Sequence, residues 1–523
     1  VTLFYAEENW RGKRAWHKYK LRLEAKGKSL DWTAYIPPPV PDDQNIFKAP
    51  HMEGFKKGNG TNEFLTVRAG RSHELVVAKL VVVVPGRTSE PAFADFHDAA
   101  SPAEALAEIE RRASRRALAA QGVITLVADD MRQMTPVRIA LASEKNLSSE
   151  ELRKLLPGFT VRPTGANAFA VVLENTVSAG DYLARAATAE DNLKALREAL
   201  KRPFARLDGD YQVPFRTPIQ NFVRIRVVSQ TLAQRAQSFL LLGKPEEALA
   251  ELTLIQKMRG MFEAPPGRKP STLVAAMINV AINGLYVSVV QDGLRLKAWR
   301  DAELAALGEQ LKGIGLLPLV SESLNHEMAA ATHLGQIVPL SKIFRLAEDA
   351  KRFSIFDLLP QGWAYQNIIT YAKMMEQQID SIESALPLIV PRRIDQAAEA
   401  IETGLARSSP FIYLARVAIP NSGKALQTAA RNQTIVNQAQ IVCALERYRL
   451  ARQEYPAGLE ELVPQFLPAI PRDLIGGDAP RYRRISDGKF LLYSVGWNGK
   501  DDGGQSDADP KQGDWIWTWN LNR

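Results

Sequence analysis

The spacing of apolar residues changes along the chain and divides it into four regions. An aromatic stripe and a run of prolines occupy the first region, and β-branched runs alternate with capped helical segments in the second. In the third region apolar residues recur at helical spacing, whereas the fourth has short apolar runs among glycines, prolines and aspartates. We expect a mainly α protein of helical hairpins or a bundle, with a small N-terminal α/β domain and a small C-terminal β-meander domain. The predicted domains are 1–60, 61–185, 186–440 and 441–523.

The first region combines a basic helix with a proline-rich strap. Four apolar side chains fall at helical spacing among lysines and arginines: Trp10, Trp16, Tyr19 and Leu23. Such a helix can lie on an anionic membrane surface, or its aromatic stripe can dock on the core of the protein, and docking is the favoured alternative. The prolines within 36–41 fix an extended backbone, so this segment is expected to be a strap or linker.

The second and third regions carry recognisable local signals. The β-branched runs 74–84, 123–127 and 168–173 are predicted to be strands, and helix N-caps at Ser101 and Ser148 complete a small α/β domain.

In the third region, one helix is expected to stop at Gly243 and the next to start at Pro245. This pair looks like a tetratricopeptide-type hairpin, but a single copy supports a local helix pair and not a superhelical groove. Residues 270–291 contain no charge, and a buried central helix is favoured over a transmembrane one.

Composition narrows the classes of partner. The chain has 523 residues, with 66 lysines and arginines against 58 aspartates and glutamates, and its net charge of +8 is spread along its length. A nucleic-acid-binding protein gathers basic residues on one element, so we expect no nucleic-acid partner. The single cysteine, Cys443, excludes an intrachain disulfide framework and is predicted to be a small buried residue.

The last region carries three motifs in order: a Tyr-Pro helix exit, a Pro-x-Asp turn and a Tyr-Ser-x-Gly strand, at 455–456, 471–473 and 493–496. This order resembles the globular domain of the major pseudopilins of type II secretion. The resemblance covers only the end of the chain, and no pseudopilin-type apolar helix leads into the module. We therefore expect a shared domain and not a filament subunit of that kind.

In that family an acidic, glycine-rich loop after the Tyr-Ser-x-Gly strand binds calcium. The resemblance implies calcium as a cofactor here, with these candidate ligands: Asn498, Asp501, Asp502, Asp507, Asp509 and Asp514. Calcium prefers several hard oxygen ligands, which such a loop can supply. The family commonly has an acid where Asn498 stands, so a solvated acidic hairpin loop remains the alternative.

Four earlier segments resemble uncharacterised proteins of Verrucomicrobia and Planctomycetes, namely 9–16, 36–45, 200–203 and 360–363. Such proteins typically begin with a membrane-anchoring segment, so the resemblance implies an envelope location. The apolar residues 1–6 before a basic stretch are typical of the end of a signal or anchor. We expect a periplasmic or cell-surface protein, anchored in the membrane before processing or truncation.

The catalytic patterns that we searched for are weak. His326-Glu327 and His333 are too widely spaced for a helical zinc motif, and satisfied or surface histidines are favoured. The pairs 97–98 and 129–130 fit loops and strand-end turns better than catalytic sites.

Three functions therefore stay open, and catalytic residues stay unknown. The favoured one is a non-enzymatic, envelope-associated scaffold or interaction protein that binds a protein partner and carries a possible calcium-braced C-terminal domain. Contact of its basic helix with a membrane surface is possible, but docking of that helix on the core is favoured. The alternatives are an accessory component of a pilus or type II-like secretion machine, and a hydrolase with dispersed catalytic residues.

Overall fold

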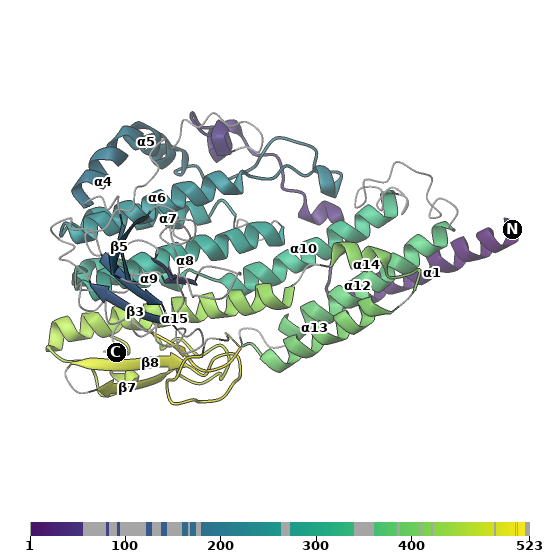
Figure 1. Ribbon diagram of the computed structural model, residues 1–523. Helices are drawn as coiled ribbons and strands as arrows, with labels where there is room; N and C mark the ends of the chain where they lie inside the picture. The colour runs from purple at the N-terminus through teal and green to yellow at the C-terminus, as the bar shows by residue number, and fades with distance from the viewer. Residues whose placement is uncertain are drawn as a thin grey trace.

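The computed structural model describes most of the chain outside the second region: residues 2–55, 80–82, 92–94, 122–127, 138–143, 159–165, 168–173, 179–262, 272–338, 360–383, 388–407, 409–419, 422–485, 488–507, 509 and 511–517. These residues are mostly helical, with a three-stranded antiparallel sheet near the C-terminus, as the sequence predicts (Figure 1).

The elements follow in this order. The helices are α1 (Thr2–Ala25), α4 (Ala179–Ala186), α5 (Glu190–Ala199), α6 (Phe222–Leu241), α7 (Pro245–Arg259), α8 (Leu273–Arg295), α9 (Asp301–Lys312), α10 (Leu316–Ile337), α12 (Gln361–Glu383), α13 (Pro391–Ala406), α14 (Tyr413–Ala418) and α15 (Ser422–Arg452). The strands are β1 (Leu80–Val82), β2 (Ala92–Ala94), β3 (Gly122–Val127), β4 (Arg138–Ser143), β5 (Phe159–Gly165), β6 (Ala168–Leu173), β7 (Arg481–Ile485), β8 (Lys489–Ser494) and β9 (Trp515–Ile516).

Helix α1 packs along α12, a helix that lies far away in the sequence (Figure 1). Trp16, Tyr19 and Leu23 are buried, which confirms the predicted docking on the core. Trp10 is 61% exposed, so its assignment to the same stripe was wrong. The three buried residues follow a spacing of three and four, whereas Trp10 precedes Trp16 by six residues and therefore points to another side of the helix.

Two glycines bring the backbones of α1 and α12 into contact. A Cβ atom on Gly12 would lie 2.3 Å from the carbonyl oxygen of Gly362, and one on Gly362 would lie 1.9 Å from that of Glu8. Farther along, the Glu376 carboxylate of α12 accepts hydrogen bonds from Tyr19 (2.8 Å) and Arg22 (2.6 Å). Close backbone contact at one end and a charged cluster at the other fix the position of α1.

The predicted hairpin of the third region is confirmed as α6 and α7. Gly243, with a φ of 70°, reverses the chain, and Pro245 begins α7. Between the two helices the buried Arg235 guanidinium pairs with Glu251 at 2.9 Å. This ion pair is shielded from water. Replacing one partner by a neutral residue would leave a buried, unpaired charge and lower the free energy of unfolding.

Helix α8 is the buried central helix that its uncharged sequence predicts. It packs against α6, α7, α10 and α15. It is also the one helix among the described residues that is long and apolar enough to cross a membrane, and 61% of its most apolar window is buried within the protein. Its polar Asn279 is buried and accepts a hydrogen bond from Arg259 at 2.8 Å.

Strands β1 to β6 lie in the second region. β1 pairs with β2, and β3, β4, β6 and β5 form an antiparallel sheet in that order. The predicted strands at 123–127 and 168–173 are confirmed. Of the predicted strand 74–84 only β1 is described, and the helices expected after Ser101 and Ser148 lie outside the described residues, as do 97–98 and 129–130.

The C-terminal sheet has the order β7-β8-β9, with both pairs antiparallel. It lies beside α15, which starts before residue 441 and ends after it, so that the predicted boundary falls inside one helix (Figure 1). The buried Gln438 of α15 donates a hydrogen bond to the carbonyl oxygen of Trp515 at 2.7 Å. Buried apolar residues from Trp16 to Trp517 form one connected core that joins the sheet to the helices.

Replacing Gly362 by alanine tests the close packing of α1 on α12. The added methyl group would force the two backbones apart, and we expect the free energy of unfolding to fall by about 1–3 kcal/mol in chemical denaturation. Gly308→Ala in α9 is the control, because nothing lies within 4 Å of its methyl group and helix propensity predicts a gain of about 0.5–1 kcal/mol. A Gly362→Ala protein as stable as the wild type would contradict the described contact.

Candidate functional site

The loop between β8 and β9 is organised around one buried carboxylate. Asp514 is 2% exposed, and its side chain accepts backbone N–H bonds from Gly504 (2.7 Å), Asp502 (3.3 Å) and Gln505 (3.3 Å). Burial raises the pKa of Asp514, and these hydrogen bonds oppose that effect. At the start of the loop, Gly496 has a φ of 66°, and a Cβ there would lie 2.2 Å from the carbonyl oxygen of Gly513.

Asp501 is held on the outer side of the same loop. Its carboxylate accepts hydrogen bonds from the Tyr493 hydroxyl (2.9 Å), the Gly503 N–H (3.0 Å) and Arg481 Nε (3.1 Å). The Tyr493 hydrogen bond, followed by that of Gly503, lowers the pKa of Asp501.

The remaining predicted ligands form local turns. Asn498 donates to Asp502 at 2.9 Å. The exposed Asp507 and Asp509 accept backbone N–H bonds from Asp509 and Lys511, both at 2.9 Å. Such Asx turns shape a loop without any ion.

All six predicted calcium ligands lie in the loop between β8 and β9. Among the residues that the structure describes, no three aspartate, glutamate, histidine or cysteine side chains are grouped as a metal ion would need. The oxygens of Asp501 and Asp514 already accept N–H or O–H donors, and these hydrogen bonds shape the loop without an ion. Calcium binding therefore stays a prediction of the resemblance.

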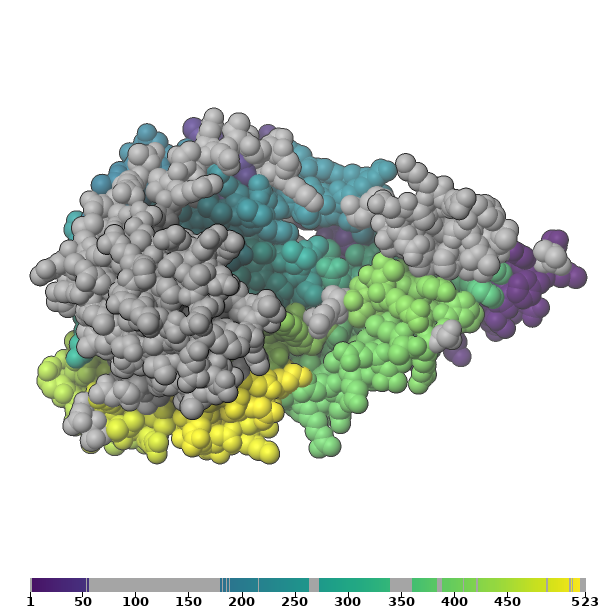
Figure 2. All heavy atoms as spheres, viewed as in Figure 1, coloured from purple at the N-terminus to yellow at the C-terminus, as the bar shows by residue number. Residues whose placement is uncertain are grey.

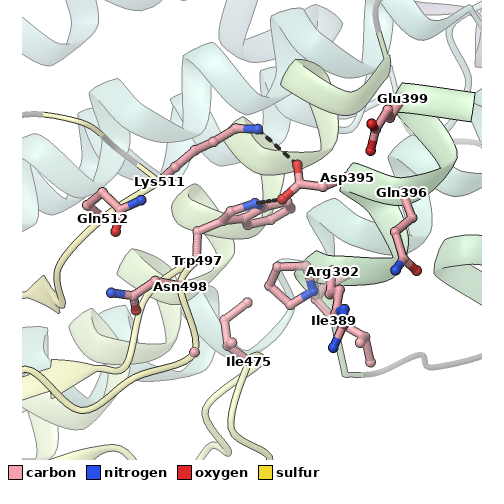
Figure 3. Close-up of a pocket in the computed structure, with 13 residues that line it drawn as sticks. Ile389, Arg392, Asp395, Gln396, Glu399, Ile475, Trp497, Asn498, Lys511 and Gln512 are labelled. Carbon is pink, nitrogen blue, oxygen red and sulfur yellow. Dashed lines mark hydrogen bonds and ion pairs between the residues drawn. The ribbon is translucent and has the colours of Figure 1, made fainter. Parts of the chain in front are cut away.

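The same loop forms one wall of a cleft of about 550 Å³ opposite α13 (Figure 3). The lining residues come from the start of α13, from the segment before β7 and from the acidic loop: Ile389, Val390, Pro391, Arg392, Asp395, Gln396, Glu399, Ile475, Trp497, Asn498, Gly499, Lys511 and Gln512. Of the six predicted ligands, only Asn498 lines it.

Asp395 joins the two walls of the cleft. Its carboxylate accepts hydrogen bonds from Trp497 Nε1 at 3.1 Å and Lys511 Nζ at 2.9 Å, as the dashed lines in Figure 3 show. Next to it, the Ile389 N–H donates to the carbonyl oxygen of Leu474 at 2.7 Å. The start of α13 is thereby tied to the C-terminal domain at both backbone and side-chain level.

Three side chains of α13 offer unused polar groups to the cleft. Arg392, Gln396 and Glu399 are exposed and follow a spacing of four and three residues, so they share one face of the helix. Within the described part of the chain none of the three has a hydrogen-bond or ion-pair partner. No serine, threonine, cysteine or histidine is among the described residues that line the cleft. Unpaired polar groups of this kind can bind a polar ligand reversibly.

Sequence reasoning missed the α13 wall. Pro391 signals the start of a helix, but a charged helical face reads as a solvated surface when its neighbour is unknown. Only the fold places Asp395 against Trp497 and Lys511, residues that follow it by more than a hundred positions.

The histidines noted in the sequence join an aromatic cluster on α10. Trp32 packs edge-on against His326 (5.2 Å between ring centroids) and is stacked with His333 (6.3 Å), while Tyr35 packs on His326 at 5.4 Å. His326 is buried and its Nδ1 has no hydrogen-bond partner. The strap that follows Tyr35 is extended, as predicted, and this cluster anchors it to α10.

Cys443 is fully surrounded by protein, as predicted. Its side chain is 1% exposed, and burial raises the pKa of its thiol. A thiol of this kind is a structural residue and not a nucleophile.

Comparison with known proteins gives no independent guide. No family model, no curated protein and no solved structure matches this chain.

Burial of His326 predicts a loss of stability in acid. Burial lowers its pKa from 6.5 to about 4, so the folded chain holds it neutral while the unfolded chain protonates it. The free energy of unfolding should fall as the pH drops from about 6.5 to about 4, by on the order of 3 kcal/mol from this group.

Denaturation of wild type and His326→Phe across this pH range measures the effect. The variant keeps an aromatic ring and should lose this part of the pH dependence, whereas His17→Gln, at an exposed position, should keep it. Identical pH profiles for wild type and His326→Phe would contradict the assignment.

Proposed function

We propose that this chain is a non-enzymatic, envelope-associated interaction protein that binds a peptide segment of a partner in the cleft between α13 and the C-terminal domain. The observation that carries the proposal is the row of unused polar side chains on α13, Arg392, Gln396 and Glu399, facing an acidic loop across a cleft of about 550 Å³. The cleft is large enough for several residues of an extended chain.

The chemistry of the lining favours a peptide. Gln396, Asn498 and Gln512 carry amide groups, which can donate to and accept from a peptide backbone. Arg392 and Glu399 offer charges of both signs, and such pairs select partner side chains of opposite charge. The half-buried side chain of Ile475 supplies apolar contact area between the polar groups.

The position of the cleft supports recognition by a preformed site. Asp395 holds Trp497 and Lys511 in place, so the ligand need not pay to order these side chains. A rigid scaffold that carries a loop-lined site is a common arrangement for binding.

The envelope part of the proposal rests on the two sequence resemblances. The long helix α15 followed by the three-stranded sheet β7-β8-β9 is the order expected of a pseudopilin-like domain, and this supports the second candidate, an accessory component of a pilus or secretion machine. Copurification with assembled pilin-like filaments would favour that candidate over a free-standing scaffold. That the second region is a small α/β domain is likewise a proposal. No observation favours the third candidate, a hydrolase.

Peptide selection tests the cleft. A random peptide library displayed on phage is panned against the full chain, and the enriched peptides are measured by fluorescence anisotropy. We expect the charge-swapped variant Arg392→Glu/Glu399→Lys to weaken their binding by at least about tenfold, because one misplaced charge pair costs well over 1 kcal/mol.

The matched control is Arg226→Glu/Glu402→Lys, which makes the same exchanges at exposed positions outside the cleft, one of them on α13. It should bind like the wild type. Peptides that bind all three proteins equally, or a library that yields no binders, would overturn the cleft as a peptide site.

Calcium binding by the acidic loop is a separate proposal that rests on the pseudopilin resemblance. Calcium that binds only the folded chain must raise the unfolding temperature of the whole protein, and a chelator must reverse the rise. The rise should disappear in Asp501→Asn/Asp502→Asn, which keeps the shapes of the side chains. Unchanged thermal unfolding at millimolar calcium would remove the metal site without affecting the cleft.

A further inference from the structure

Helix α1 has a second apolar face, opposite the one that packs on α12. Leu3, Trp10 and Leu21 are 87%, 61% and 52% exposed. A spacing of seven residues is about two helical turns and one of eighteen is five turns, so the three side chains stand in one line along α1. Trp16 and Leu23, which belong to the buried face, lie on the other side of the helix.

Basic side chains flank this line. Lys13, Arg14 and Lys18 are exposed and have no ion-pair partner among the described residues, and the Arg14 guanidinium lies 5.1 Å from the centre of the Trp10 ring. The acids of α1 do not balance them, because Glu8 pairs with Arg11 and Glu24 with Lys20. Among the acids of α1, which the structure describes from Thr2 to Ala25, only Glu7 is exposed and unpaired.

The location of the helix leaves this face accessible. The N-terminal end of α1 extends past the other helices at one end of the molecule (Figures 1 and 2). Phe4, which is 50% exposed, adds a further aromatic ring at this end. A flat surface can reach these exposed side chains without displacing any element that the structure describes.

We propose that the outer face of α1 binds the surface of an anionic phospholipid bilayer. A line of leucine and tryptophan between lysines and arginines is the arrangement of helices that lie in the interface, where the apolar side chains enter the acyl boundary and the cations meet lipid phosphates. Trp10 suits this interface because its ring is apolar and its N–H is polar. The charge complementarity with anionic lipids and the exposed Trp10 favour a bilayer over a protein surface as the partner of this face.

This inference rests on the proposed envelope location and not on the cleft. Membrane contact through α1 would orient the whole protein, because the contacts at Gly12 and Glu376 fix α1 to the helices. The cleft beside α13 and the outer face of α1 would then act in one molecule with different ligands.

Vesicle cosedimentation tests the proposal with the full chain. One set of vesicles contains phosphatidylglycerol and phosphatidylcholine, and the other contains phosphatidylcholine alone. We expect the wild type to pellet with the anionic vesicles at least about tenfold more strongly than with the neutral ones, and to be released as salt is raised. Equal binding to both vesicles, or none to the anionic ones, would overturn the proposal.

Two variants locate the surface. Trp10→Ala/Leu21→Ala and Lys13→Glu/Lys18→Glu should each weaken binding by at least about tenfold with unchanged unfolding, because these side chains are exposed. Their matched controls, Val223→Ala/Val274→Ala and Lys257→Glu/Lys500→Glu, alter exposed residues elsewhere and should bind like the wild type. Losses of the same size in the controls would overturn the assignment to α1.

The cleft variant Arg392→Glu/Glu399→Lys separates the two proposals. It should still bind anionic vesicles, since its net charge is unchanged and α1 is intact. Failure of the peptide experiment with vesicle binding preserved would overturn the cleft alone, and the reverse result would overturn the membrane surface alone.

Discussion

The structure depends on the burial of one helix from two directions. In the second half of α15, the residues from Ile441 to Leu445 are all at most 1% exposed, so helices cover one side and the C-terminal sheet covers the other. A helical stretch that is apolar on all sides, as this one is, is stable in water only when it is enclosed in this way. Removing the sheet would expose these residues, and the sheet alone would lose most of its core. The C-terminal segment is therefore an integral part of the helical body.

The cleft is a consequence of this packing. Once the sheet is fixed on α15, the β8–β9 loop faces the start of α13, and Asp395 can bind Trp497 and Lys511. The hydrogen bonds of Asp395 are polar and partly exposed, so they add little stability on their own. Their effect is to hold together two walls whose separation the apolar core already sets. The proposed recognition in the cleft and the proposed membrane contact through α1 would both use surfaces at the edge of one connected core.

Local sequence signals predicted local structure well. Gly243 and Pro245 gave the hairpin, the uncharged run gave α8, and the motifs at the end of the chain gave the antiparallel sheet. Contacts between distant segments could not be predicted, because their signals are ordinary taken singly. Gly12 reads as a weak point in a helix until Gly362 lies against it. Composition also does not show where the carboxylates of the acidic loop point, and the inward position of Asp514, which accepts backbone N–H bonds, could not be predicted.

Native-state hydrogen exchange tests the central claim that sheet, cleft and helices form one body. The amide of Ile389, which donates to Leu474 across the base of the cleft, is compared with that of Val442 in the middle of α15. If the cleft is part of the same cooperative unit, both amides exchange only through global unfolding, with similar opening free energies and the same dependence on denaturant. If Ile389 exchanges orders of magnitude faster while Val442 stays protected, the two walls of the cleft separate without global unfolding, and a preformed cleft is contradicted.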